Sequence, residues 1–314
     1  MADDRGGCEP VLSSSCEKGS MPSLGSTECE RVGVLPTWTE PSVESGSWGV
    51  TPADCADGFA SDGGNGCIAI LPAQPCEPTT LALPGDSECH PVSDCGEAPY
   101  GNLAVSILAD PSTLFVDRNY DPVVGGASDG TSVHPFTTIQ AAIDASTWGV
   151  NIVVADGSYK ENIEITAHPL KLWGRCSDAV EIYGQAGVQG TVLITHTNNT
   201  ELHGFRVTGD SDGAAIVVIS AKQVLVDGVR IDSTAHHGVS VEGPGVLGAS
   251  AIIQDSLIDG AHDAGVLVLS AAATVSRSVI RNTVSGGSST SAGFGIELDS
   301  QPAYGASTLV LWIR

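Results

Sequence analysis

The stretch LVDGVRIDSTAHHGVSVEG, residues 225–243, gathers residue types that can carry out chemistry. It places Asp227, Arg230 and Asp232 close to the adjacent histidines His236 and His237. Carboxylates can bind a cation or exchange protons with a substrate, and histidine titrates near neutral pH. The same residues also suit the solvent-facing positions of a repeating scaffold. Whether these residues form an active site or belong to one coil of a solenoid therefore depends on the elements that position them.

The composition favours thin β-structure with many turns. Of the 314 residues, 41% are hydrophobic, only 5% are aromatic and 38 are glycine, so the core must consist of Val, Ile, Leu and Ala. The net charge of −24 repels nucleic acid and anionic membranes, and it could attract divalent cations. No apolar run approaches the roughly 18–20 residues that a membrane span needs, and the polar start MADDRGGC does not resemble a signal peptide.

The cysteines concentrate at the N-terminus, where they predict disulfide bonds. Eight of the nine lie in the first 95 residues: Cys8, Cys16, Cys29, Cys55, Cys67, Cys76, Cys89 and Cys95. A zinc site is disfavoured because the region has no C-x2-C pair and only one histidine, His90. Disulfides at this density indicate an oxidising compartment, although spacing does not give their connectivity. The isolated Cys176 is expected to be a buried small apolar residue.

The cysteine spacing and a later repeat divide the chain into two regions. Residues 1–98 are expected to form two loop-rich modules, the first incomplete, and residues 99–314 a separate domain. In that domain LVDGVRID (225–232) matches LHGFRVT (202–208), IIQDSLID (252–259) and TVSRSVIR (274–281). A partner strand follows each match, at 215–218, 238–241, 265–268 and 295–298. Repeats of this kind predict a β-solenoid, in which each turn adds one strand to each sheet and insertions emerge at the corners.

Two further segments carry a family resemblance. DGTSVHPFTTIQAAI (129–143) and GSYKENI (157–163) are similar to the start of bacterial right-handed parallel β-helices of the pectin-lyase-like superfamily. The resemblance implies an all-β fold, a right-handed parallel β-helix with a capping helix near 136–146. The cysteine-rich region resembles modules that precede such domains in secreted or surface-anchored proteins. The chain is therefore expected to be an extracellular or cell-envelope piece of a longer protein, interrupted within its last coil.

The superfamily contains enzymes, adhesins and proteins without known activity, so the fold does not settle the function. A polysaccharide lyase needs a cation and a base, and candidates are present: Asp227, Asp232, Asp255, Asp259 and Asp263 with Arg230, Arg277 or Lys222. The superfamily's lyase patterns W-I-D-H and R-x-P-x-x-R are absent, as is the full polygalacturonase set around HHG. We expect a non-catalytic structural or glycan-binding scaffold. The alternatives are calcium-assisted β-elimination on a polyuronide and, less favoured, glycoside hydrolysis. No catalytic residue is assigned.

One corner of the solenoid holds the densest group of possible ligands. Aligning the coils on Ala215, Gly238, Gly265 and Gly295 places histidines and aspartates in adjacent columns, along which successive coils lie about 4.8 Å apart. The candidates are Asp212, Asp232, His236, Asp259, His262 and Asp263. Two interpretations remain open. The corner is either a solvated turn with an incidental His–Asp pair or a weak contact site for a glycan or a divalent cation, of which calcium suits carboxylate oxygens best.

Overall fold

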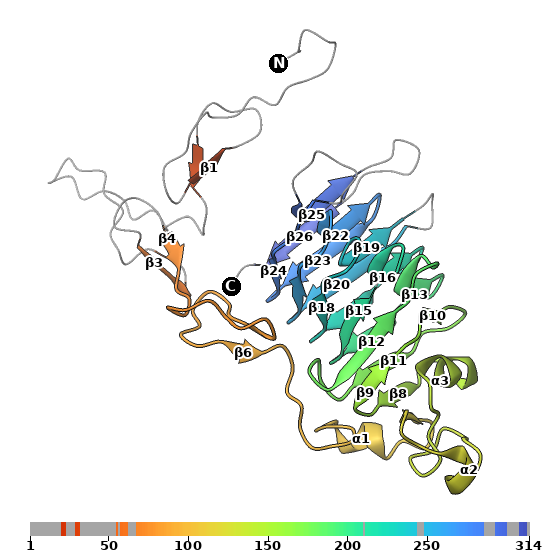
Figure 1. Cartoon of the computed structure of the whole chain (residues 1–314). Coiled ribbons are helices and arrows are strands. Elements are labelled where there is room, and N and C mark those ends of the chain that lie inside the picture. The colour runs from red at the N-terminus through yellow and green to blue at the C-terminus, as the bar shows by residue number, and fades with distance from the viewer. Residues whose placement is uncertain are drawn as a thin grey trace, which may run out of the picture. The chain divides into compact units, whose positions relative to one another are not determined.

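The computed structural model describes residues 20–22, 29–31, 55, 57–61, 67–209, 211–243, 248–285, 293–299 and 308–312. The chain divides into two compact units. One consists of residues 1–75 with 82–89 and residue 314, and the other of residues 76–81 with 90–313. The second unit contains three stacked parallel sheets, which we name A, B and C (Figure 1).

The strands of the three sheets follow one another in turn along the chain, so that each coil contributes a strand to every sheet. Sheet A consists of β7 (Leu114–Val116), β8 (Asn151–Val154), β11 (Lys171–Gly174), β14 (Glu201–His203), β17 (Val224–Asp227), β20 (Ser250–Gln254), β23 (Ala272–Ser276) and β26 (Thr308–Trp312). Sheet B consists of β9 (Gly157–Tyr159), β12 (Val180–Gly184), β15 (Arg206–Gly209), β18 (Arg230–Asp232), β21 (Leu257–Asp259) and β24 (Val279–Arg281). Sheet C consists of β10 (Ile163–Ile165), β13 (Gly190–Thr195), β16 (Ala214–Ile219), β19 (Val239–Glu242), β22 (Ala264–Leu269) and β25 (Phe294–Asp299). The predicted parallel β-helix is confirmed.

Strand register stacks equivalent apolar side chains inside the coils. In sheet A one buried column contains Ile152, Leu172, Leu202, Val226, Ile253 and Val275. The registered pairs Ile216 with Val239, Val239 with Val266 and Val266 with Ile296 confirm the alignment used for the coil corner. Because alternate residues of a strand point to opposite faces, the neighbours of each buried residue form columns on the outside.

The eight-residue sequence repeat contains two strands rather than one. In LVDGVRID, β17 and β18 are separated by Gly228 and Val229, and the φ of Gly228, +61°, lies in the left-handed region that glycine adopts most easily. Gly204, Asp255 and Arg277 have the same left-handed conformation between the corresponding strands of three other coils. This single-residue bend directs the chain from sheet A into sheet B.

A short helix packs against the first coils. The helix α3 (Ile139–Ala145) buries Ile139, Ala142 and Ile143 in the interior cluster. It was expected near 136–146 but begins later, since Thr138 caps it by accepting from the Ala141 N–H, while Phe136 forms a parallel bridge with Val116. Two four-residue helices precede it, α1 (Val105–Leu108) and α2 (Pro122–Gly125).

Glu161 from the GSYKENI motif completes the cap of α3. Its two carboxylate oxygens accept from the backbone N–H groups of Ile139 and Gln140 at 2.8 and 3.0 Å. The Gln140 side chain in turn bonds the backbone of Glu164 at both its N–H and its carbonyl. The two motifs that carry the family resemblance therefore bind each other.

Short antiparallel pairs occur outside the solenoid: β1 (Ser20–Pro22) with β2 (Cys29–Arg31), β3 (Phe59–Ser61) with β4 (Cys67–Ala69), and β5 (Thr80–Leu81) with β6 (His90–Pro91). Cys55 and Cys67 form a disulfide, and Cys76 and Cys89 each take part in a disulfide as well. Cys8 and Cys16 lie outside the described residues, as does the side chain of Cys29.

Cys176 was expected to be an unbonded apolar residue, and this expectation is wrong. Cys176 is fully buried, but it forms a disulfide with Cys95 across a sequence separation of 81 residues. The eighth N-terminal cysteine therefore finds its partner in the turn between β11 and β12. Spacing gives no signal for such a bond, since the two cysteines meet only after the coils have formed.

The cap of α3 yields a stability prediction. Replacing Glu161 by Ala leaves two N–H groups without their acceptor, and we expect the free energy of unfolding to fall by about 1–2 kcal/mol. Urea denaturation followed by circular dichroism measures the change. Glu164→Ala is the matched control, because that side chain is exposed and only its backbone bonds Gln140. Equal losses in both variants would contradict the assigned role of Glu161.

Candidate functional site

The structure brings part of the predicted corner together. The His262 N–H donates to the carbonyl of His236 at 2.9 Å, so these two residues lie on adjacent coils. Asp263 follows with a left-handed φ of +62° and donates its N–H to the carbonyl of Val284. His236 and Asp212 are exposed, and the Asp212 N–H donates to the carbonyl of Val188.

The other two predicted ligands, Asp232 and Asp259, are engaged by arginines. They are registered neighbours in β18 and β21, as the column alignment predicts. However, Arg230 Nε donates to Asp232 at 2.9 Å, and Arg281 Nε donates to Asp259 at 2.8 Å. Burial raises the pKa of the Asp232 carboxyl above its ordinary value, although Arg230 and Arg206 act in the opposite direction.

His237 lies at the same corner and was not among the predicted candidates. Its buried Nδ1 has no hydrogen-bond partner within the part of the chain that the structure describes. Burial lowers the pKa of His237, against the opposing charges of Asp263, Glu297 and Glu242. The neutral ring is therefore favoured. Across the described ranges, no three His, Cys, Asp or Glu side chains are arranged to hold a metal ion, and binding of a cation or glycan at this corner stays a prediction.

A second cluster lies on the outer face of sheet A, where sequence analysis did not place a site. We call it the His203 ladder, and it consists of Asn151, Lys171, Trp173, Glu201, His203, Asp227 and Gln254. The residues occupy two outward columns of β8, β11, β14, β17 and β20, with Trp173, His203, Asp227 and Gln254 in register. The repeat alignment contained this signal, because His203, Asp227 and Gln254 share one repeat position.

His203 stands at the centre of this ladder between two carboxylates. Its Nδ1 lies 3.1 Å from Asp227 Oδ2, and its Nε2 lies 3.1 Å from Glu201 Oε2. Because ionised carboxylates only accept hydrogen bonds, a doubly protonated imidazolium is the form that donates to both. The ring also stacks on Trp173, with centroids 3.8 Å apart and planes 6° from parallel.

Further contacts extend the ladder in both directions. Lys171 Nζ lies 2.9 Å from Glu201 Oε1, and Trp173 Nε1 donates to Asn151 at 3.0 Å. On the far side, Gln254 donates to Asp227 at 3.2 Å. Polar side chains of five successive strands are thus connected, and both nitrogens of His203 are already occupied. The geometry suits a stabilising network better than a general base.

The electrostatics of the ladder favour ionised carboxylates. Burial acts to raise the pKa of Glu201, but hydrogen bonds and charge from Lys171 and His203 outweigh it, so the pKa lies below its ordinary value. The pKa of Asp227 is lowered in the same way, against its burial, by His203 and Gln254.

Comparison with known proteins places the chain in a family. The family described as "Protein of unknown function (DUF1565)" matches residues 123–306, which is more than half of the chain. The chain belongs to the DUF1565 family. The match begins within α2 and covers the helix α3 and the strands from β8 to β25. No curated protein and no solved structure matches the chain. A search of the described residues finds no helix with the length and apolar character to cross a membrane.

The His203 ladder predicts a loss of stability in acid. Glu201 and Asp227 have lowered pKa values in the folded state, so their contribution is complete above their unfolded values of about 4 and is lost as the pH falls through the folded values. We expect Glu201→Gln combined with Asp227→Asn to lower the free energy of unfolding at pH 7 by about 1–3 kcal/mol. The variant should also weaken the pH dependence below about pH 4.

Urea denaturation at a series of pH values measures both effects. Glu164→Gln serves as the control, because it removes an exposed carboxylate outside the ladder. If the free energy of unfolding of the double variant falls in acid as steeply as that of the wild type, the ladder is not the source of the acid sensitivity.

Proposed function

We propose that this DUF1565 protein is a non-catalytic scaffold of the cell surface or the extracellular space, whose rigid β-helix displays a polar, acidic surface. The observation that carries the proposal is the pairing of charged side chains across coils. Arg206 bonds Glu181, Arg277 bonds Asp255 and Arg281 bonds Asp259. Each of these pairs joins neighbouring strands or turns, so the charges support the stack.

The same pairing argues against the lyase alternative. A lyase of this fold needs carboxylates free to hold calcium and a cationic side chain free to act as base. Two of the three candidate bases are engaged: Arg277 is bonded to Asp255, and Arg230 is bonded to both Asp178 and Asp232. The candidate ligand Asp227 is bonded to His203. These groups would have to leave their partners before any could meet a substrate.

The disulfides and the net charge support the proposed location. Disulfides persist in oxidising surroundings, which for most organisms lie outside the cytosol. A net charge of −24 keeps an exposed protein soluble and disfavours contact with nucleic acid. The partner that this proposal includes is an envelope or extracellular polysaccharide. Membership in the pectin-lyase-like superfamily would agree with such a partner.

An activity and binding panel tests this function. The purified chain is incubated with a series of polyuronides, with and without calcium, and followed by the ultraviolet absorbance of unsaturated products and by reducing-sugar release. We expect no turnover, and retention on an insoluble polyuronide without turnover would identify the scaffold as a glycan binder. Calcium-dependent product that disappears in Asp255→Asn or Arg277→Ala would overturn the proposal in favour of a lyase.

A further inference from the structure

A segment that precedes the β-helix contacts several of its coils. We call residues 76–81 and 90–96 the strap. At its start, the guanidinium of Arg281 in β24 donates to the carbonyl oxygens of Glu77, Pro78 and Thr80 at 3.2, 3.1 and 3.3 Å. These bonds attach the strap to the sixth strand of sheet B.

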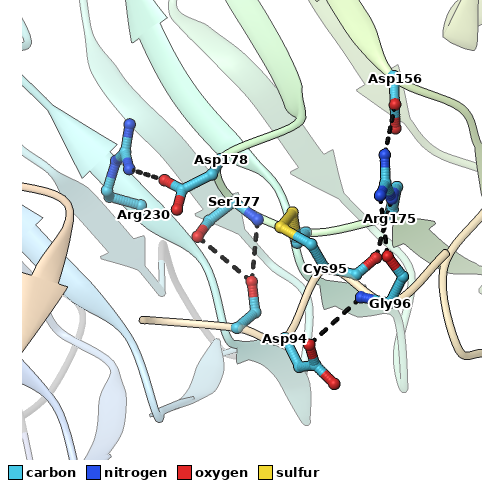
Figure 2. Close-up of a disulfide and its surroundings, with 10 residues drawn as sticks. Asp94, Cys95, Gly96, Asp156, Arg175, Ser177, Asp178 and Arg230 are labelled. Carbon is cyan, nitrogen blue, oxygen red and sulfur yellow. Dashed lines mark hydrogen bonds and ion pairs between the residues drawn. A yellow bond between two sulfur atoms is a disulfide. The ribbon is translucent and has the colours of Figure 1, made fainter. Parts of the chain in front are cut away.

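The end of the strap is bound to a much earlier coil. The Ser177 N–H donates to Ser93 Oγ at 2.9 Å, and Arg175 donates to the carbonyl oxygens of Cys95 and Gly96 at 2.9 and 2.8 Å. The Cys95–Cys176 disulfide lies among these bonds, as Figure 2 shows. Ser93 also lies against Gly228 in the bend between β17 and β18. The strap therefore runs across the coils from β24 back to the turn between β11 and β12.

Side chains on the outer face of sheet B are buried, which indicates that the strap covers this face. Leu257 points outward, in register with Arg230, yet it is fully buried and does not belong to the interior cluster. Leu81 and Val92 of the strap are likewise buried outside the interior cluster, at 2% and 7% exposure. The side chain of Arg230 is only 4% exposed. A second, smaller apolar layer thus forms between the strap and sheet B.

The arrangement changes how the solenoid can unfold. In a stack of repeats each coil contacts only its neighbours, so coils at an end can separate one after another. The strap adds contacts between coils that do not touch each other. Within these contacts, the Cys95–Cys176 disulfide is the covalent bond that attaches the strap to the coils. Without that bond, the strap depends on a few hydrogen bonds and a small apolar layer.

We propose that the strap is a redox-controlled latch. With Cys95 bonded to Cys176 it couples the coils from β11 to β24 into one cooperative unit, and with the bond reduced it detaches and the later coils open separately. The latch closes by thiol–disulfide exchange with an oxidised dithiol, which is a second molecule that carries a disulfide. The two cysteine thiols lose two electrons and two protons as the sulfur–sulfur bond forms, and the oxidised dithiol becomes two thiols. Opening by a reduced dithiol is the reverse reaction.

Native-state hydrogen exchange on the whole chain tests the latch, with Cys95→Ser/Cys176→Ser as the variant. We expect amide protection in the strap and in β18, β21 and β24 to fall by about tenfold or more, while protection in β8, β11 and α3 stays near that of the wild type. Cys55→Ser/Cys67→Ser is the matched control, since it removes a disulfide of the other unit. It should leave protection in the β-helix unchanged.

Two results would overturn the latch. Unchanged protection would show that the strap stays closed without the disulfide, and a uniform loss over all coils would make the disulfide a global stabiliser only. If the variant does not fold, a chain in which Cys55, Cys67, Cys76 and Cys89 are replaced by Ser is folded oxidised and then reduced with a dithiol, and exchange before and after reduction is compared. The same three outcomes decide whether the strap is a latch: a loss of protection confined to the strap and the later coils, no change, or a uniform loss over all coils. None of them depends on glycan binding or on turnover, so the latch and the proposed function can fail separately.

Discussion

The backbone hydrogen bonds between coils form only when successive strands lie parallel and in register, and this constraint organises the rest of the β-helix. Register places each inward side chain above its counterpart, which produces continuous columns such as Leu172, Leu202 and Val226. Such a column buries apolar surface without large aromatic residues, because every layer fills the same small cross-section. The low aromatic content and the abundance of Val, Ile and Ala are consequences of that geometry.

The same constraint stacks the outward side chains, so like charges that stand in register, such as Asp232 and Asp259, need unlike charges beside them. Like charges directly opposite each other on neighbouring strands are destabilising. In this chain outward charged residues form ion pairs with oppositely charged neighbours, such as Asp255 with Arg277 and Asp259 with Arg281. Exposed pairs of this kind contribute little singly. The more buried His203 ladder is better shielded from water, and it connects five strands of sheet A. The polar residues of LVDGVRID follow this pattern, since Asp227 is bonded to His203 and Arg230 to Asp178.

Contacts that run across the stack complete the structure. Glu161 joins the first coils to α3 through the N–H groups of Ile139 and Gln140. The strap joins coils that do not otherwise meet, and the Cys95–Cys176 disulfide holds one end of it. A solenoid with interactions only between neighbouring coils would gain stability in proportion to its length, whereas these cross-links make distant coils depend on one another. Rigidity of that kind suits a protein that presents a surface.

The sequence alone determined the β-helix, the capping helix and the coil register. Its repeats are local patterns, and stacking forces equivalent positions such as Gly238 and Gly265 into the same column. It did not reveal that the repeat bends at Gly228, since alternation on either side of the bend looks like one continuous strand. Nor could it show that Asp232 and Asp259 are held by arginines, because a column alignment gives neighbours but not side-chain directions. Tertiary structure alone decided the pairing of Cys95 with Cys176. Residues 81 positions apart in the sequence become bonding partners only where the folded chain brings the strap across the coils.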